Sequence, residues 1–320
     1  MKKIAVLTSG GDAPGMNACI RAVVRAGIFN GFEVYGVKRG YNGLITDDME
    51  RLEMRSVSSI IQRGGTMLYS ARCLEFKTPE GQAVAIENMK RRGIEGLIVI
   101  GGDGSFRGAC AITNQCGIPT VGIPGTIDND LAYTDFTLGF DTAANTVVSL
   151  INNIRDTMTS HSRMSVIEVM GRNCGDLALY SGIAGGAEVI IVPEVPVTAE
   201  EVISRIEASR SKGKVSCIIV IAEGVKDFEP KLEVIRERLH ADMRVSVLGH
   251  IQRGGSPTMR DRLLASQFGT RAVELLMENK GSRAIGIRND QIIDMDIIEA
   301  VEMPRKFNKE LYEMAKILAM

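Results

Sequence analysis

Two short polar loops hold the residues best suited to chemistry. The first, residues 101–105, reads Gly-Gly-Asp-Gly-Ser and directly follows the apolar run 97–100. The second, residues 124–130, reads Pro-Gly-Thr-Ile-Asp-Asn-Asp and directly follows the strand-like run 120–123. Because open parallel sheets bind their ligands at the carboxyl ends of the strands, we expect both loops to lie on one rim of a sheet.

The first loop combines glycines with a single carboxylate. Glycines let the backbone approach a bulky anion and adopt positive φ, and the N–H groups that begin the next helix favour phosphate. Asp103 would repel a bare phosphate, but a Mg²⁺ ion between them removes the conflict, because Mg²⁺ binds one or two carboxylates together with phosphate oxygens. A tight strand-to-helix turn capped by Asp103 explains the loop equally well, so this loop alone leaves both interpretations open.

The second loop places Asp128 and Asp130 on either side of Asn129. Three polar residues directly after a buried strand are costly to bury unless they bind something. One carboxylate could act as general base on an acceptor hydroxyl, and the other could orient that hydroxyl or the metal shell. Taken alone, an Asx turn is the simpler interpretation. Beside a loop that binds metal and phosphate, phosphoryl transfer becomes the better one.

Composition sets the class of protein. The chain has 320 residues, of which 45% are hydrophobic and 24% charged, with a net charge of −1. These values are ordinary for a globular protein and give no electrostatic reason to expect nucleic acid or an acidic membrane as partner. The six cysteines have neither metal-site nor C-x-x-C spacing. We therefore expect buried thiols in a cytoplasmic protein that binds neither nucleic acid nor membrane.

Strand and helix patterns alternate almost throughout the chain. Their number predicts an α/β fold of two doubly wound, mostly parallel, three-layer domains with the active site in the cleft between them. The glycine-rich turn after the first strand lacks the G-x-G-x-x-G spacing of a dinucleotide site. Residues 40–52 are expected to be irregular, and residues 55–63 to form a short helix.

Basic side chains in loops suggest further anion sites. Arginine suits phosphate because its planar fork donates two parallel hydrogen bonds, although any single loop arginine, like the lone His250, is more simply a structural or solvated residue. Arg21 and Arg25 share one helix face. With Arg155, Lys212 and Lys214 they could form a second anionic pocket, but independent solvated charges are the simpler interpretation. The arginines in loops after strands or beside glycines are Arg72, Arg163, Arg172, Arg244 and Arg253.

Five motifs, in this order, give the chain a specific resemblance over essentially its whole length. It resembles the bacterial ATP-dependent 6-phosphofructokinases. The resemblance implies transfer of the γ-phosphoryl group of ATP, a co-substrate used with Mg²⁺, to the 1-hydroxyl of fructose 6-phosphate, which gives fructose 1,6-bisphosphate and ADP in glycolysis. The motifs are residues 8–17 (TSGGDAPGMN), 101–105 (GGDGS), 124–130 (PGTIDND), 170–172 (MGR) and 249–257 (GHIQRGGSP).

The resemblance also implies residue roles. Asp128 would be the general base, with Thr126 and Arg172 stabilising the migrating phosphoryl group and Asp130 completing the catalytic set. Asp103 would hold Mg²⁺. The residues implied for ATP are Gly11, Arg72, Cys73, Gly102, Asp103, Gly104 and Ser105. Those implied for the sugar phosphate are Thr126, Ile127, Asp128, Arg163, Met170, Gly171, Arg172, Glu223, Arg244, His250, Ile251, Gln252 and Arg253.

Domains and assembly follow from the same resemblance. Residues 1–138 plus 251–305 would form the ATP and Mg²⁺ domain, and residues 139–250 plus 306–320 the sugar-phosphate domain. Arg163 and Arg244 match positions that reach into a neighbouring subunit's site, which implies a homotetramer with shared active sites.

An effector site for ADP or phosphoenolpyruvate is implied at a subunit interface. Ser59, however, stands where the related bacterial enzymes carry Asp, and Val215-Ser216 replaces a usual Lys-His pair. We hypothesise that effector control is weakened or altered. The effector residues implied are Arg21, Arg25, Arg155, Gly186, Glu188, Lys212 and Lys214.

The phosphoryl donor is predicted from two glycines. Pyrophosphate-using relatives carry Asp in place of Gly104 and Lys in place of Gly125, so glycine at both positions predicts ATP. A pyrophosphate-dependent enzyme is therefore the nearest alternative. An NAD or lipid kinase would share the first loop but leave residues 124–130 and 249–257 unexplained. A non-catalytic nucleotide-sensing module would have no need for Asp128.

Overall fold

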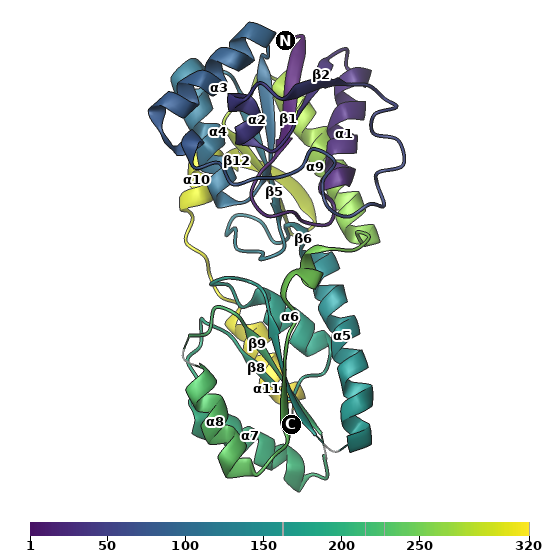
Figure 1. Ribbon diagram of the computed structural model, residues 1–320, viewed down its shortest axis with the longest axis vertical. Helices are drawn as coiled ribbons and strands as arrows, with labels where there is room; N and C mark the ends of the chain where they lie inside the picture. The colour runs from purple at the N-terminus through teal and green to yellow at the C-terminus, as the bar shows by residue number, and fades with distance from the viewer. Residues whose placement is uncertain (162, 215, 227, 320) are drawn as a thin grey trace. The chain divides into compact units, whose positions relative to one another are not determined.

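A computed structural model describes residues 1–319 except 162, 215 and 227, and divides the chain into two compact units (Figure 1). Neither unit is a continuous stretch of sequence. The first unit comprises Met1–Ile127, Leu131–Thr142 and Arg253–Arg305. The second comprises Asp128–Asp130, Ala143–Gln252 and Lys306–Met320.

The first unit is built on an eight-stranded sheet with the order β12-β11-β5-β4-β1-β2-β3 and with β6 paired to β5. The pairs β2–β3 and β11–β12 are antiparallel, and the other pairs are parallel. The central strands are almost continuously apolar because helices cover both of their faces. The strands are β1 (Lys3–Thr8), β2 (Glu33–Val37), β3 (Met49–Leu52), β4 (Gly96–Gly101), β5 (Thr120–Thr126), β6 (Leu138–Gly139), β11 (Arg283–Arg288) and β12 (Gln291–Asp296).

Helices flank this sheet on both sides (Figure 1). Ala5, Leu7, Leu97 and Val99 point to the face where α3 and α4 pack. On the opposite face α1 packs against α9, and Gly269 of α9 lets the two helix backbones come close, because a side chain there would meet Cys19 and Val23 backbone atoms. The helices are α1 (Met16–Phe29), α2 (Tyr41–Ile45), α3 (Pro79–Arg92), α4 (Asp103–Cys116), α9 (Met259–Met277) and α10 (Ile297–Glu302).

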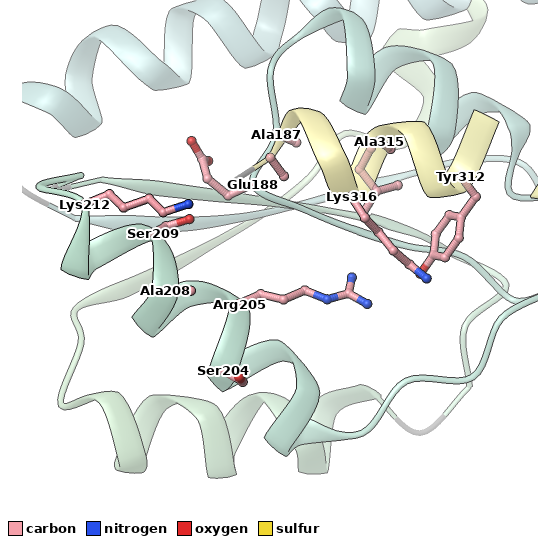
Figure 2. A pocket seen from close by; sticks show the side chains of 12 residues that line it. Ala187, Glu188, Ser204, Arg205, Ala208, Ser209, Lys212, Tyr312, Ala315 and Lys316 are labelled. Atoms are coloured by element: carbon pink, nitrogen blue, oxygen red, sulfur yellow. The ribbon is translucent and has the colours of Figure 1, made fainter. Parts of the chain in front are cut away.

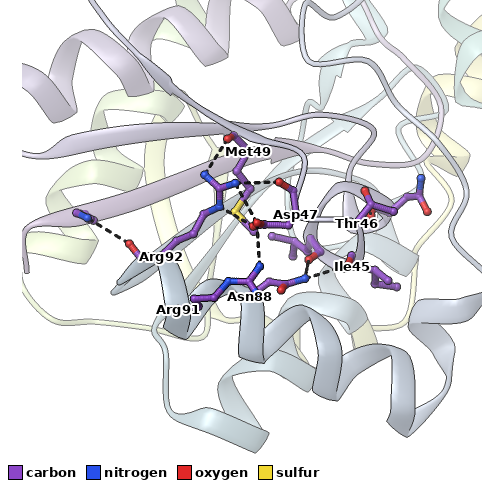
Figure 3. A network of polar contacts seen from close by, with 10 residues as sticks. Ile45, Thr46, Asp47, Met49, Asn88, Arg91 and Arg92 are labelled. Atoms are coloured by element: carbon purple, nitrogen blue, oxygen red, sulfur yellow. Dashed lines mark hydrogen bonds and ion pairs between the residues drawn. The ribbon is translucent and has the colours of Figure 1, made fainter.

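A polar network fixes the segment between α2 and β3 to α3 (Figure 3). Arg92 donates two parallel hydrogen bonds to the Asp47 carboxylate, from Nε to Oδ1 at 2.5 Å and from Nη2 to Oδ2 at 3.0 Å. It also donates to the Met49 carbonyl oxygen at 3.1 Å. Asn88 donates to the carbonyl oxygens of Leu44 and Ile45 at 2.9 and 2.8 Å. The pKa of Asp47 is lowered by the Arg92 hydrogen bond, so the pair stays ionised.

The second unit has a four-stranded, all-parallel sheet with the order β10-β7-β9-β8. Helices α7 and α8 cover one face, and α5, α6 and α11 cover the other. Helix α7 begins at a capping box between Thr198 and Glu201, as expected for Thr three residues before Glu. The elements are α5 (Phe140–His161), β7 (Met164–Val169), α6 (Asp176–Ala184), β8 (Val189–Ile191), α7 (Ala199–Ser211), β9 (Cys217–Ala222), α8 (Phe228–Leu239), β10 (Met243–Val247) and α11 (Lys309–Leu318).

The predicted α/β class with mostly parallel, doubly wound sheets is confirmed. The short helix predicted over residues 55–63 was wrong: this segment forms turns, and Ser59 adopts a left-handed φ of 55°, which an α-helix does not tolerate. Residues 40–52 are more regular than predicted, because they contain α2 and β3. Among the described residues, no helix is both long and apolar enough to cross a membrane.

Candidate active site

Three loops meet beside the carboxyl ends of β1 and β4 in the first unit. The Ser9 N–H donates to the Ile100 carbonyl oxygen at 2.9 Å, which joins the loop after β1 to the end of β4. The Ser70 hydroxyl donates to the Gly10 carbonyl oxygen at 2.5 Å, and the Thr8 hydroxyl donates to the Tyr69 carbonyl oxygen at 2.8 Å. The predicted ATP residues Gly11, Arg72 and Cys73 therefore lie in loops that are hydrogen-bonded to one another.

The loop after β4 turns directly into a helix. Gly102 is the N-cap of α4, and Asp103 is the first helical residue. Ser105 is buried, and Tyr41 donates a hydrogen bond to its carbonyl oxygen. The first turn of α4 directly follows the end of β4, and a helix N-terminus at such a place favours phosphate.

Asp103 is available to a metal ion. Its side chain is 45% exposed, and its ion pair with Arg107, 3.2 Å away on the next turn, is of the weak surface kind. No group of three or more His, Cys, Asp or Glu residues among those described is close enough to hold a metal. A single exposed carboxylate beside the N–H groups of a helix N-terminus suits Mg²⁺, whose other ligands would be phosphate oxygens and water.

Gly104 and Gly125, the two glycines from which the phosphoryl donor is predicted, have different surroundings. A side-chain carbon added at Gly104 or Gly102 would meet nothing within 4 Å, so the space beside this loop is open. At Gly125 the same carbon would lie 3.0 Å from Ile100 and 3.1 Å from Met16. A residue larger than glycine therefore fits at 104 without change, whereas at 125 it forces neighbouring side chains to move.

In the second unit, the loop after β5 presents a buried carboxylate. Asp128 is 2% exposed, and its Oδ2 lies 3.3 Å from Nε of Arg172, a residue that follows β7. The Arg172 side chain is 58% exposed, so most of the guanidinium is free to meet a ligand. The Arg172 N–H donates to Oε1 of Glu223 at 2.8 Å, which ties the ends of β7 and β9 together.

Two residues beside this carboxylate hold strained backbone conformations. Asn129 and Arg172 have φ of 52° and 53°, values that non-glycine residues rarely adopt. The Asn129 amide donates to Oδ2 of Asp176 at 3.1 Å, in the first turn of α6, and the Cys174 thiol lies 3.9 Å from the Asn129 carbonyl oxygen. Strain of this kind persists where surrounding contacts fix the conformation, and it clusters at functional sites.

Several other predicted sugar-phosphate residues lie at the same strand ends. Gln252 is fully buried and bridges two loops: its Oε1 accepts from the Met170 N–H at 3.1 Å, and its Nε2 donates to the Gly249 carbonyl oxygen at 3.0 Å. The pKa of Glu168 is raised by burial and by the nearby Glu223 carboxylate. The second unit thus offers one buried acid with an adjacent arginine at a rim of polar groups, an arrangement suited to deprotonating a hydroxyl beside an anion.

A family model described as Phosphofructokinase matches residues 3–276. This chain belongs to the phosphofructokinase family. Proteins named ATP-dependent 6-phosphofructokinase from Clostridioides difficile (strain 630) and Thermoanaerobacter sp. (strain X514) are 56% identical over 319 residues and 57% identical over 320 residues, with 100% of each chain covered.

Solved phosphofructokinases share the fold. The phosphofructokinase of Saccharomyces cerevisiae superposes with a TM-score of 0.89 at 37% identity over 99% of this chain and 47% of that one, so this chain spans about half its length. A structure titled as a pyrophosphate-dependent phosphofructokinase from Marinobacter aquaeolei has a TM-score of 0.87 at 23% identity, over 97% of this chain and 86% of that one. At that identity the likeness concerns the fold alone.

Two arginines predicted for the sugar phosphate lie away from Asp128. Arg163 directly precedes β7, and Arg244 is the second residue of β10, so both are at the amino ends of strands whose carboxyl ends carry the site. They share one carboxylate: Asp242 lies 2.8 Å from Nε of Arg163 and 3.2 Å from Nε of Arg244. A strand the length of β7 separates them from Met170 and Arg172 of the same chain.

Arg253 belongs to the first unit, although it is predicted for the sugar phosphate. Its guanidinium packs on Gly11, where a side-chain carbon would lie 2.2 Å from Nη1, and it donates to the Asp12 carbonyl oxygen at 3.2 Å. A side chain at position 11 would therefore displace this guanidinium. His250 and Ile251 lie in the 3-10 helix Gly249–Arg253, and Ile251 is 56% exposed.

Part of the predicted effector set converges in the second unit. Glu188 is buried, and its carboxylate is 3.4 Å from Nζ of Lys214 and 3.7 Å from Nη1 of Arg155. Arg155 also donates to the carbonyl oxygens of Gly185 and Gly186, each at 2.7 Å.

The other predicted effector residues belong to other elements. Arg21 and Arg25 lie on α1 in the first unit, and Lys212 is exposed at the end of α7. Ser59 is exposed and Ser216 half-buried, while Val215 lies outside the described residues.

Sequence reasoning missed the residues that position the loop after β5. Asp176 and Cys174 contact Asn129 from 47 and 45 residues farther along the chain, and no local spacing connects them. The available signal was the carboxylate that follows Gly175 at the start of α6, to which the sequence motifs give no role.

Proposed function

We propose that this chain transfers the γ-phosphoryl group of ATP to the 1-hydroxyl of fructose 6-phosphate, as a cytoplasmic enzyme of glycolysis. The observation that carries the proposal is the buried carboxylate of Asp128 held beside the exposed guanidinium of Arg172. Membership of the phosphofructokinase family and the names of full-length relatives at 56% and 57% identity support the substrates.

In the proposed reaction, Asp128 accepts the proton of the sugar hydroxyl. The hydroxyl oxygen then bonds to the γ-phosphorus while the bond from that phosphorus to the bridging oxygen of ADP breaks. Arg172, with most of its guanidinium exposed, and Thr126 at the end of β5 stabilise the charge that spreads over the transferred oxygens. A positioned general base typically contributes roughly 10²–10⁴ in rate.

The first unit would hold the nucleotide. The N–H groups of residues 102–104 and the open space beside Gly104 suit the phosphates, and Arg72 and Cys73 lie in a loop hydrogen-bonded to the Gly11 loop. Asp103 would hold Mg²⁺, which offsets phosphate charge when bound. The open space at Gly104 supports ATP as donor, because a side chain there would occupy volume that a nucleotide needs.

Active sites shared between subunits are part of this proposal. Arg163 and Arg244 lie at the amino ends of their strands, whereas Asp128 lies beside the carboxyl ends. One chain therefore cannot bring them to its own Asp128, and a neighbouring copy would have to supply them. A homotetramer satisfies this need, and light scattering coupled to size-exclusion chromatography tests it: a fully active monomer would contradict it.

Control by an effector is proposed to be weak or altered. Glu188, Lys214 and Arg155 form a charged cluster around a buried carboxylate, as expected for a site that takes ADP or phosphoenolpyruvate. Ser59 provides no carboxylate to such a ligand. Initial rates measured against fructose 6-phosphate with phosphoenolpyruvate, then with ADP, test this hypothesis; strong cooperative inhibition that ADP relieves would overturn it.

A coupled assay with fructose 6-phosphate and Mg²⁺, comparing ATP with pyrophosphate, tests the reaction itself. We expect turnover with ATP alone. Turnover with pyrophosphate would support fructose 6-phosphate as the acceptor. It would contradict the inference, drawn from Gly104 and Gly125, that ATP is the donor. Nucleotide binding with no turnover on either donor would favour a nucleotide-sensing module instead.

A further inference from the structure

A cavity of about 270 Å³ lies in the second unit between α7, β8 and α11 (Figure 2). None of the residues lining it belongs to the loops that follow β5, β7 or β9. Glu188 and Lys212 of the predicted effector set lie at its rim, but Arg205, Tyr312 and Lys316 do not belong to that set. The cavity therefore needs an explanation of its own.

The cavity arises from the end of the sheet. Strand β8 is the edge strand, and α7 and α11 pack on its opposite faces through Val202 and Tyr312, respectively. Among the described strands, none lies beyond this edge between the two helices. The side chains there are small, Ala208 from α7 and Ala315 from α11, so the space between the helices is left unfilled and its walls are largely apolar.

Basic side chains from both α7 and α11 line the cavity. Arg205 and Lys212 are seven residues apart on α7 and so share one face of it. Within the described part of the chain, neither side chain forms an ion pair. Figure 2 shows Arg205 extending from α7 toward the side of the cavity where Lys316 and Tyr312 of α11 lie, and Nζ of Lys316 lies 4.7 Å from the centre of the Tyr312 ring.

The nearby acids are already engaged. One oxygen of Glu188 accepts from the Ile218 N–H at 2.7 Å, and the other faces Lys214 and Arg155. Glu201 accepts from the Thr198 N–H at 2.8 Å in the capping box that begins α7. Glu313 forms an ion pair with Lys316 at 2.5 Å, so the positive charge left for a ligand comes from Arg205 and Lys212.

A polar atom at the cavity wall also lacks a partner. Tyr312 is 2% exposed, and among the described residues its hydroxyl has no hydrogen-bond partner. Buried hydroxyl groups are almost always hydrogen-bonded, so an unpaired one calls for an explanation. An acceptor oxygen on a bound molecule would satisfy it.

We propose that this cavity binds a small organic anion with an apolar body, specifically an aromatic carboxylate. The apolar walls would enclose the ring, the fork of Arg205 would bind the carboxylate through two parallel hydrogen bonds, and the Tyr312 hydroxyl would donate to one of its oxygens. The volume is smaller than that of pockets for drug-sized ligands, which restricts the ligand to one ring with a short chain.

The test uses 3-phenylpropionate and its neutral amide, 3-phenylpropanamide, as a matched pair of probes. Their dissociation constants are measured by ligand-detected NMR titration on the full chain without nucleotide or sugar phosphate, so the result does not depend on the proposed kinase reaction. We expect the carboxylate to bind at least tenfold more tightly than the amide, because only the anion pairs with Arg205. Equal affinities, or no binding of the carboxylate, would overturn the proposal.

Variants localise the binding. Arg205→Gln should weaken 3-phenylpropionate binding about tenfold, and Tyr312→Phe about fivefold with an unchanged melting temperature, since the hydroxyl gives up no hydrogen bond. Ala208→Leu should block binding by filling the cavity. Arg236→Gln is the matched control, because Arg236 sits on α8 in a surface pair with Glu233 and should leave the affinity unchanged. An unchanged affinity in Arg205→Gln, or a loss in Arg236→Gln, would reject this site.

Discussion

The loops after β4 and β5 both follow buried strands and both carry a carboxylate, yet they are built differently. In the loop after β4 the Asp103 side chain is 45% exposed, and the space beside Gly104 is open. In the loop after β5 Asp128 is 2% exposed, and Asn129 is hydrogen-bonded to Asp176. The first loop is shaped to receive a ligand, whereas the second is held in place before any ligand arrives.

Substitutions in the two loops should therefore have different effects. Changes in the open loop should alter how much metal or nucleotide is needed, and leave the fold intact. Changes in the closed loop should alter the rate of the chemical step, because a preorganised group acts only if its geometry is kept. Each of the following experiments measures both a rate and a binding or stability quantity.

The largest effect is expected at Asp128. In Asp128→Ser the proton acceptor is removed, so kcat should fall by roughly 10²–10⁴ while binding of fructose 6-phosphate largely survives. Steady-state kinetics give kcat, and equilibrium dialysis of the labelled sugar phosphate gives its affinity. Loss of sugar binding with normal turnover would contradict the role of Asp128 as general base. It would also contradict the proposed difference between the loops after β4 and β5.

Asp103→Asn should act through the metal. An amide is a weaker Mg²⁺ ligand than a carboxylate, so the Mg²⁺ concentration at half-maximal rate should rise about 10- to 100-fold. The melting temperature should stay unchanged, because the exposed pair with Arg107 contributes little to stability. Arg107→Gln is the control and should leave the Mg²⁺ requirement as it is.

Gly104→Asp should affect the nucleotide and spare the fold. The new carboxylate would occupy open space near the phosphates, so KM for ATP should rise about tenfold. Gly125→Ala is the contrasting variant: its methyl group would press on Ile100 and Met16 and should destabilise the protein by about 1–3 kcal/mol. Thermal unfolding and ATP kinetics on both variants test the contrast, and a stable Gly125→Ala protein would weaken it.

Asn129→Gly should give the smallest effect. Glycine keeps the left-handed backbone at this position but removes the amide that donates to Asp176, so kcat should fall about fivefold with KM for ATP unchanged. Asp176→Asn should give a similar loss. If neither variant changes kcat, the strained loop is held by its other contacts alone.

Sequence patterns predicted the parts of the fold where local and tertiary preferences agree. Strands β1, β4 and β5 are apolar runs buried on both faces, and the loops that follow them were identified from composition alone. Residues 55–63 were misread, because a left-handed Ser59 has no signature in the spacing of apolar residues.

The parts of the candidate site that lie within one loop could be predicted from the sequence. The contacts between segments far apart in the sequence could not. Asp103 and Asp128 stand out in their own loops, and the resemblance supplied their roles. The contacts of Asn129 with Asp176 and of Arg253 with Gly11 join distant segments, so spacing could not reveal them. The cavity beside β8 depends on small side chains from two helices on opposite faces of a sheet, which no sequence pattern connects.

The interleaving of the two units has a consequence for biosynthesis. The first unit needs α9 to cover α1, and the second needs α11, whose Tyr312 and Ala315 belong to its core. Both helices emerge from the ribosome late, so neither unit can reach its native packing while most of the chain is being translated. Nascent chains should therefore expose the α1 face and one face of the smaller sheet to chaperones until these two helices have emerged.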